Sequence, residues 1–187
     1  MEQYLSSFNF LSGEEIAFLL SKGRAKTIKK GEFFIRQGAV CQEIAFVESG
    51  FFRSFYHNSA DEDVTYCFSF AGAFVTAYSS FISQTATFEN IEALADVTIF
   101  SIPRETIVQL EATSVNWARF SKMMAEQEFI KMEQRFLLFV RENAEYRYKD
   151  LLEKYPEYLQ LIPLGYLSSY LGITQRHLSR IRKAVMI

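Results

Sequence analysis

The chain has 187 residues, of which 49% are hydrophobic and 22% are charged, and it contains only 8 Gly and 3 Pro. These values exclude low-complexity, collagen-like and disordered polymers, and they indicate one compact domain or two small ones with apolar cores. The longest apolar runs fall far short of the roughly 20 residues that a membrane span requires, and no basic segment of a signal peptide opens the chain. We therefore expect a cytoplasmic protein without a membrane partner.

Two cysteines, Cys41 and Cys67, are too few for a disulfide scaffold or a four-thiolate iron–sulfur cluster. Free cysteine is among the residue types most often buried, so both are expected to be small apolar core residues. With only two histidines, the chain also lacks the clustered imidazoles of a metal-dependent barrel enzyme. No cofactor and no metal are expected.

A short helix is predicted near the N-terminus, where Ser12 and Glu15 have the spacing of a capping box and Gly23 provides a stop. From Lys26 onward the pattern changes to short β-like runs separated by turn signals. The candidate strands are residues 32–36, 43–48, 51–56, 64–70, 89–93 and 97–102. Six or more short antiparallel strands in so short a stretch indicate a small roll or sandwich.

After Pro103 the pattern predicts helices over 104–110, 114–143 and 147–155. Apolar residues of the long middle helix recur by alternating threes and fours, the spacing of a heptad seam that only Lys122 interrupts. The seam comprises Ala118, Ala125, Phe129, Met132, Phe136 and Phe139. A helix of about 30 residues is ~45 Å long and exceeds what one small domain can bury, so a second subunit is expected on Ala125, Phe129, Met132 and Phe136. The alternative is a wholly intramolecular core helix.

Charge is distributed unevenly along the chain. The stretch 164–187 contains four of the 20 basic residues and no acid, so the remainder carries 16 basic and 22 acidic residues. A basic end on an acidic body is typical of a nucleic-acid-binding segment, although a merely solvated face is the alternative. In contrast, the stretch 54–103 contains six acids and neither Lys nor Arg. An anionic ligand bound there would find no side-chain cation.

The basic end has the pattern of a helix-turn-helix. Leu164, Leu167 and Leu171 give one face of a short helix, and Gly172 follows where a sharp bend is needed. Small Ser168 allows the two helices to approach closely. Thr174 is expected to cap the second helix, whose exposed side enters the major groove of DNA. The predicted DNA-contacting residues are Thr174, Gln175, Arg176, His177, Ser179, Arg180 and Lys183.

Along nearly its full length the chain resembles the Crp/Fnr family of bacterial transcription regulators. The segments that carry the resemblance are 29–38, 44–50 and 171–182. It implies an α+β protein in which residues 1–113 form an N-terminal antiparallel β-roll sensor, a jelly roll like that of cyclic-nucleotide-binding domains. Residues 114–143 would be a dimerisation helix, and residues 144–187 an all-α helix-turn-helix domain that binds DNA.

The chain departs from this family at the nucleotide site. Members that bind cyclic nucleotides hold the ribose with the Glu of a Gly-Glu pair and the phosphate with a later Arg. Here Gly72 is retained, but Ala73 or Phe74 stands at the Glu position and an uncharged residue near Thr87, followed by Phe88, at the Arg position. These five residues are expected to form a degenerate ligand pocket without useful affinity for cyclic AMP. Surrounding aromatic residues would suit an apolar effector, although plain core packing is the alternative.

The DNA end departs from the family as well. Only four residues follow Lys183, so the β-hairpin wing of winged members is expected to be absent or to precede the motif. Gln175, Arg176 and Arg180 stand where familiar members commonly carry Arg, Glu and Arg, so the familiar half-site does not transfer. Arg180 is the expected guanine contact.

The leading hypothesis is a homodimeric regulator that binds a palindromic operator in double-stranded DNA and responds, if to any effector, to an unidentified small molecule. The alternative is a small-molecule-binding β-roll protein whose helix-turn-helix is degenerate. An enzyme is not expected, since neither a nucleophile elbow nor a phosphate-binding loop is present.

Overall fold

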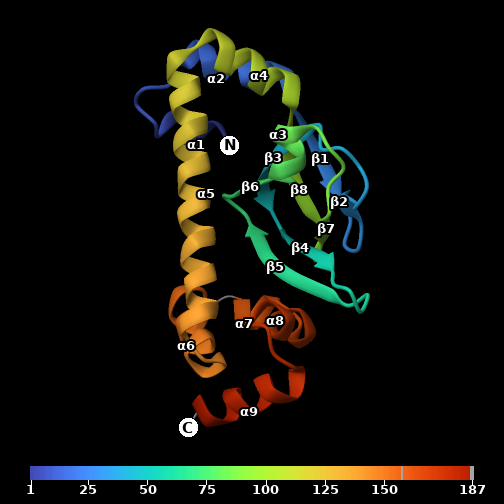
Figure 1. The fold of residues 1–187 in the computed structure, drawn as a ribbon. Coiled ribbons are helices and arrows are strands. Elements are labelled where there is room, and N and C mark those ends of the chain that lie inside the picture. Colours follow the sequence, from blue (N-terminus) through green and yellow to red (C-terminus); the bar gives the residue numbers. More distant parts are fainter. Residues whose placement is uncertain (157, 186–187) are drawn as a thin grey trace. The chain divides into compact units, whose positions relative to one another are not determined.

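A computed structural model describes residues 1–156 and 158–185. The chain divides into two compact units, one made of residues 1–56 and 67–125 and the other of residues 57–66 together with the chain from residue 126 onward (Figure 1). The division falls inside the long helix rather than at either of its ends. In the part of the chain that the structure describes, every helix is too short or too polar to cross a lipid bilayer.

The first unit is built on two four-stranded sheets. One sheet has the order β1-β8-β3-β6 and the other β2-β7-β4-β5, and the pairings β1–β8, β3–β8, β3–β6, β2–β7 and β4–β7 are antiparallel. The strands are β1 (Arg24–Ile28), β2 (Phe33–Ile35), β3 (Glu43–Ser49), β4 (Phe51–His57), β5 (Asp63–Phe70), β6 (Phe74–Val75), β7 (Asn90–Ala93) and β8 (Val97–Pro103). All six predicted strands are confirmed. Two strands, β1 and β6, were not predicted from the sequence.

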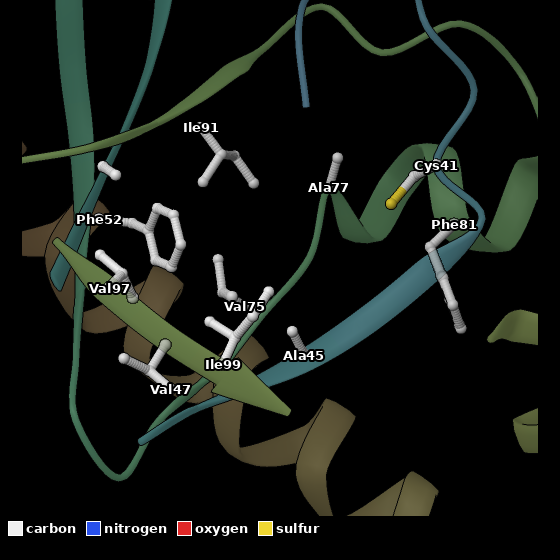
Figure 2. Packing of buried hydrophobic residues seen from close by; sticks show 11 residues of the cluster. Cys41, Ala45, Val47, Phe52, Val75, Ala77, Phe81, Ile91, Val97 and Ile99 are labelled. Atoms are coloured by element: carbon white, nitrogen blue, oxygen red, sulfur yellow. The ribbon is translucent and has the colours of Figure 1, made fainter. Parts of the chain in front are cut away.

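Buried side chains fill the space between the two sheets. Figure 2 shows the ring of Phe52 among the aliphatic side chains of Ile91, Val75 and Val97. Cys41 belongs to this core with an exposure of only 1%, as predicted, but Cys67 is half-buried on β5. The prediction for Cys67 was therefore too strong, because alternate residues of a strand face opposite sides of its sheet.

Helices pack beside the roll in the same unit. They are α1 (Glu2–Ser6), α2 (Gly13–Lys22), α3 (Tyr78–Ser83) and α4 (Arg104–Thr113). The predicted capping box is present, since the backbone N–H of Glu15 donates to Ser12 Oγ and the backbone N–H of Ser12 donates to Glu15 Oε2. In Figure 1, α2 and α4 lie at the beginning of the long helix, where Trp117 and Phe120 are buried with them in a second apolar cluster.

The long helix, α5 (Val115–Arg141), has 27 residues and is therefore about 40 Å long. Its buried residues, Trp117 and Phe120, lie in its first two turns, and most of the remaining length is exposed. The prediction of one uninterrupted helix over 114–143 is confirmed to within two residues at each end.

The second unit is helical apart from the tip of the β4–β5 hairpin. Its elements after α5 are α6 (Ala144–Lys154), α7 (Tyr158–Leu161), α8 (Leu164–Tyr170) and α9 (Gln175–Val185). Among the described residues after α5 none lies in a strand, so this stretch contains no β-hairpin wing. An apolar interior holds the unit together, formed by Tyr148, Leu151, Tyr158, Ile162, Leu167, Leu171, Leu178 and Ile181.

Candidate nucleic-acid interface

The turn between α8 and α9 requires glycine for two reasons. Gly172 has φ +67°, a left-handed conformation that side chains other than hydrogen disfavour. A Cβ atom placed there would lie 2.8 Å from Cε1 of Phe139 on α5. The turn closes with the backbone N–H of Gly172 donating to Ser169 O and that of Ile173 donating to Ser168 O, each at 3.0 Å. The predicted bend is therefore confirmed.

The two helices meet through their apolar faces. Leu167 of α8, the C-cap residue Leu171 and Leu178 of α9 are each no more than 2% exposed. Ser168 is buried with them and donates its hydroxyl to Gly165 O at 2.9 Å, so the small residue satisfies its own polar group within α8. Burial of this small side chain agrees with the prediction that it allows the two helices to pack closely.

Thr174 caps α9. Its Oγ1 accepts from the backbone N–H of His177 at 3.2 Å, and its carbonyl accepts from the backbone N–H of Leu178 at 3.0 Å. This cap satisfies donors that the first turn of a helix leaves without partners. The cap also defines where α9 begins, which is the helix predicted from the sequence to contact DNA.

The outward side of α9 is positively charged. Because successive residues of a helix are rotated by roughly 100°, Leu178 and Ile181 face inward while Arg176, Arg180 and Lys183 face the opposite way. These three cations are exposed, and they form no ion pair with any residue that the structure describes. Anions in solution can therefore approach all three.

The remaining predicted contact residues border this cationic face. Thr174, Gln175 and His177 are exposed, whereas Ser179 is half-buried. Gln175 lies against α8, because its Nε2 would be 3.0 Å from a Cβ atom at Gly165. The structure thus brings all seven predicted residues together on α9 and its cap.

One contact of the helix-turn-helix was not predicted. The Ser169 hydroxyl donates to Asp63 O at 3.0 Å and accepts from the backbone N–H of Thr65 at 2.9 Å, which joins α8 to the β4–β5 hairpin tip of the same unit. The partners are more than 100 positions apart in the chain. No local sequence signal indicates such a pairing.

The predicted dimer seam is exposed on α5. Phe129, Met132 and Phe136 are each about two-thirds exposed, at 66%, 68% and 65%, while Ala125 is half-buried. Phe139 is the exception, since it is half-buried beneath the turn at Gly172 and does not continue the exposed stripe. The prediction put Phe139 on the seam because heptad spacing carries no information about contacts with helices that follow later in the chain.

The five residues of the predicted ligand pocket lie in two segments. Gly72 has φ +91° in the turn between β5 and β6, followed by Ala73 and then by Phe74, which packs outside the roll core against Tyr4 and Phe46.

The second segment follows α3. Thr87 is buried and its Oγ1 accepts from the backbone N–H of Glu89 at 3.1 Å, whereas Phe88 is 84% exposed. Phe74 and Phe88 thus point away from the roll core, which Val75, Ala77 and Phe81 fill instead. Strand alternation on β6 places Val75 inward and Phe74 outward, and a ligand pocket formed by these five residues stays a prediction.

The acidic stretch 54–103 receives cations from outside itself. Lys29 Nζ donates to Asp96 at 2.8 Å, and this hydrogen bond lowers the pKa of the Asp96 carboxyl. Buried Arg53 donates to Glu92 at 3.0 Å. Both cations are engaged with carboxylates. Among the described residues, no cluster of His, Cys, Asp or Glu is arranged to hold a metal ion.

Comparison with known proteins agrees with this architecture. Residues 25–114 match the family model of the cyclic nucleotide-binding domain. No curated protein sequence matches the chain. Among solved structures, FixK2 from Bradyrhizobium japonicum is similar at TM-score 0.77 and 19% identity, covering 88% of this chain and 84% of FixK2.

Two further solved structures extend over most of the chain. A transcriptional regulator described as a member of the Crp/Fnr family, from Eubacterium rectale, has TM-score 0.75 and 18% identity over 98% of this chain and 88% of its own. The catabolite activator protein of Thermus thermophilus has TM-score 0.56 and 20% identity over 94% of this chain and 84% of its own. Identities this low establish a shared fold.

Proposed function

We propose that the protein is a homodimeric, sequence-specific DNA-binding regulator acting in the cytoplasm. The proposal is supported by the match of residues 25–114 to the cyclic nucleotide-binding domain and by the likeness of the fold to solved Crp/Fnr transcription regulators. One observation carries the proposal. It is the face of α9, behind a Thr174 cap, on which Arg176, Arg180 and Lys183 are exposed and have no carboxylate partner among the described residues.

We propose distinct roles along α9, based on where each side chain lies on the helix. Arg176 and Arg180 are one turn apart on the outward face, near enough to the capped end to meet base edges in a major groove. A guanidinium group can donate two parallel hydrogen bonds to guanine, and Arg180 is our choice for that contact. Lys183 lies in the last turn and suits a phosphate contact, as the point charge of an ammonium group carries less geometric information.

The exposed stripe on α5 supports the homodimer. Phe129, Met132 and Phe136 follow heptad spacing. A row of large apolar side chains this exposed in one copy of the chain indicates a surface that a partner covers. A second copy offers an identical stripe. A symmetric dimer would carry two α9 helices, whose half-sites in DNA lie about one helical turn, ~34–36 Å, apart.

Sedimentation of the purified chain tests the dimer. Phe136→Glu would introduce a charge into the stripe and should convert the dimer to a monomer, whereas Ile130→Glu, an exposed position outside the seam, should not. A monomeric wild-type protein contradicts the dimer, and equal effects of both variants contradict pairing through this stripe.

We also propose that cyclic AMP is not the effector. Core side chains including Val75, Ala77 and Phe81 occupy the roll interior, Thr87 Oγ1 is already hydrogen-bonded, and Arg53 is held by Glu92. The stretch 54–103 itself contains no arginine that could make a bidentate contact with a phosphate. Calorimetry should detect no binding of cyclic AMP at micromolar concentrations, and a micromolar dissociation constant would overturn this part of the proposal.

Selection from a pool of randomised DNA duplexes tests the function itself. The full-length protein should retain a palindromic sequence, and sequencing of the retained DNA would define each half-site. Retention without enrichment of any sequence would instead favour a β-roll protein that binds a small molecule and carries a degenerate helix-turn-helix.

A further inference from the structure

Two arginines from neighbouring helices contact the end of α8. Nη2 of Arg135, on α5, donates to Tyr170 O at 2.8 Å, and Nη2 of Arg147, on α6, donates to Leu171 O at 3.1 Å. Tyr170 is the last residue of α8 and Leu171 is its C-cap. Carbonyls at the end of a helix lack intrahelical partners and carry partial negative charge, so two guanidinium groups are well placed to satisfy them.

Phe139 lies under both arginines. The Cζ atoms of Arg135 and Arg147 are 4.9 Å and 4.5 Å from the centre of its ring, and the Cζ of Arg135 is also 3.7 Å from the ring of Tyr170. Stacking on aromatic faces and hydrogen bonds to carbonyls offset the repulsion between two like charges held this close. The same Phe139 ring approaches the turn at Gly172.

Arg147 also joins two helix ends. Its Nη1 donates to the carbonyl of Glu142, the residue after α5, at 2.7 Å, while its Nη2 donates to the C-cap of α8. Arg147 Nε is buried and has no acceptor among the described residues. The guanidinium plane is therefore fixed at two points, which ties the direction of α8, and of α9 beyond the turn, to the end of α5.

We propose that Arg135, Phe139 and Arg147 form a clamp of positioning residues that sets which spacing of DNA half-sites the dimer can bind. The inference rests on the proposed function, because it requires a dimer paired through α5. One base pair corresponds to about 3.4 Å of rise and about 35° of rotation, so a small change in the direction of α9 relative to α5 alters the match to both half-sites at once. The clamp itself need not touch DNA.

The test compares binding of full-length variants to the palindrome that the wild type selects. The same palindrome with one base pair inserted or deleted between the half-sites, and a duplex with a single half-site, complete the set. Arg135→Met and Arg147→Met keep the length of the side chains but remove the hydrogen bonds. Arg141→Gln, an exposed position at the end of α5, is the matched control for loss of charge.

We expect wild type and Arg141→Gln to lose about 10-fold or more in affinity when the spacing changes by one base pair, which corresponds to ~1.4 kcal/mol. The Met variants should bind the selected spacing at least ten times more weakly and discriminate less than about 3-fold between spacings, with single-half-site affinity changed less than about 3-fold. A merely structural role would weaken binding to every duplex equally.

Circular dichroism must show that the variants are folded. If a Met variant does not fold, the same binding assay is made with Arg135→Lys and Arg147→Lys. Lysine keeps the positive charge but lacks the planar guanidinium group that donates paired hydrogen bonds and stacks on the aromatic rings. Wild-type spacing discrimination in folded clamp variants, or equal loss on all duplexes, overturns the clamp. Failure of the wild type to select any palindrome is a different result and overturns the proposed function.

Discussion

The basic side chains of the two units have different surroundings. In the roll, three cations are each paired with a carboxylate, the pairs being Lys26 with Glu43, Lys29 with Asp96, and Arg53 with Glu92. On α9, Arg176, Arg180 and Lys183 have no such partner among the described residues. A cation that is already paired with a carboxylate is less available to an external anion, so the three cations of α9 are better placed to meet a polyanion than the three paired cations of the roll.

The contrast predicts that arginines of the roll act on stability. Arg53 is 2% exposed and its partner Glu92 is 17% exposed, so Arg53→Met leaves a largely buried carboxylate without this partner. Breaking such a pair should lower the free energy of unfolding by about 3–5 kcal/mol, measured by urea denaturation. Arg53→Met with Glu92→Met should recover most of the loss, since apolar replacement of both partners is close to neutral. If Arg53→Met lowers the free energy of unfolding by less than about 1 kcal/mol, the pair with Glu92 does not stabilise the roll as proposed.

On α9 the same kind of substitution should act on DNA binding. Arg180→Ala is expected to cost roughly 1–3 kcal/mol per half-site against the selected palindrome and to relax preference at one base position, as measured by fluorescence anisotropy with a panel of substituted duplexes. Its urea midpoint should stay at the wild-type value, because the side chain is exposed. Uniform weakening on all sequences would make Arg180 a phosphate contact rather than a base contact.

The turn that orients α9 offers a test with an internal control. Gly172 and Gly38 both have positive φ, at +67° and +88°, but an added Cβ would meet Phe139 at Gly172 and nothing within 4 Å at Gly38. Each Gly→Ala change should therefore cost about 1–2 kcal/mol for the left-handed backbone.

Gly172→Ala should cost more than Gly38→Ala and should also weaken DNA binding, because Phe139 or the turn must move. The two values come from urea denaturation and the binding change from anisotropy. Equal stability losses and unchanged binding would show that the contact with Phe139 has no energetic weight.

The smallest expected effect concerns Glu43, a paired carboxylate of the roll. Burial alone would raise its pKa, but hydrogen bonds from Lys26 and Ser101 and the charge of Lys26 outweigh burial and lower the pKa below its ordinary value of 4.5. The folded state therefore binds this proton less readily than the unfolded state.

It follows that the Glu43 contribution to stability is complete above pH 4.5 and is lost as the pH falls through the lowered pKa. Unfolding free energies measured against pH should show the wild type more stable than Glu43→Gln at neutral pH, with the two curves converging in acid. Parallel curves would contradict the pairing, whereas DNA binding of Glu43→Gln at neutral pH should be unchanged.

Local patterns were the features that the sequence predicted well. The capping box at Ser12 and Glu15, the bend at Gly172 and the cap at Thr174 each depend on residues within a few positions of one another, and all three are present. The strand β1 was missed because Arg24 and Lys26 interrupt its apolar character, and its pairing partner β8 lies far along the chain.

Features that depend on distant residues could not be predicted. Ser169 bridges to the hairpin at Asp63, and Arg135 meets the end of α8, through contacts that spacing along one helix does not encode. The predicted pocket includes Phe88, and the 84% exposure of this side chain in the loop after α3 depends on contacts that the local sequence does not encode. Phe139 has the spacing of the dimer seam, but the adjacent turn covers it.

We propose that Arg176, Arg180 and Lys183 of α9, which have no carboxylate partner among the described residues, give sequence-specific recognition of DNA by a dimer. The most direct measurement is the ratio of affinities for the selected palindrome and for a scrambled duplex of the same length and composition, titrated by fluorescence anisotropy at physiological salt. We predict a ratio of at least about 10³ for the wild type, within the range of specific DNA-binding proteins. Equal affinities for the two duplexes, or an undiminished ratio in the Arg176→Ala, Arg180→Ala double variant, would contradict the account.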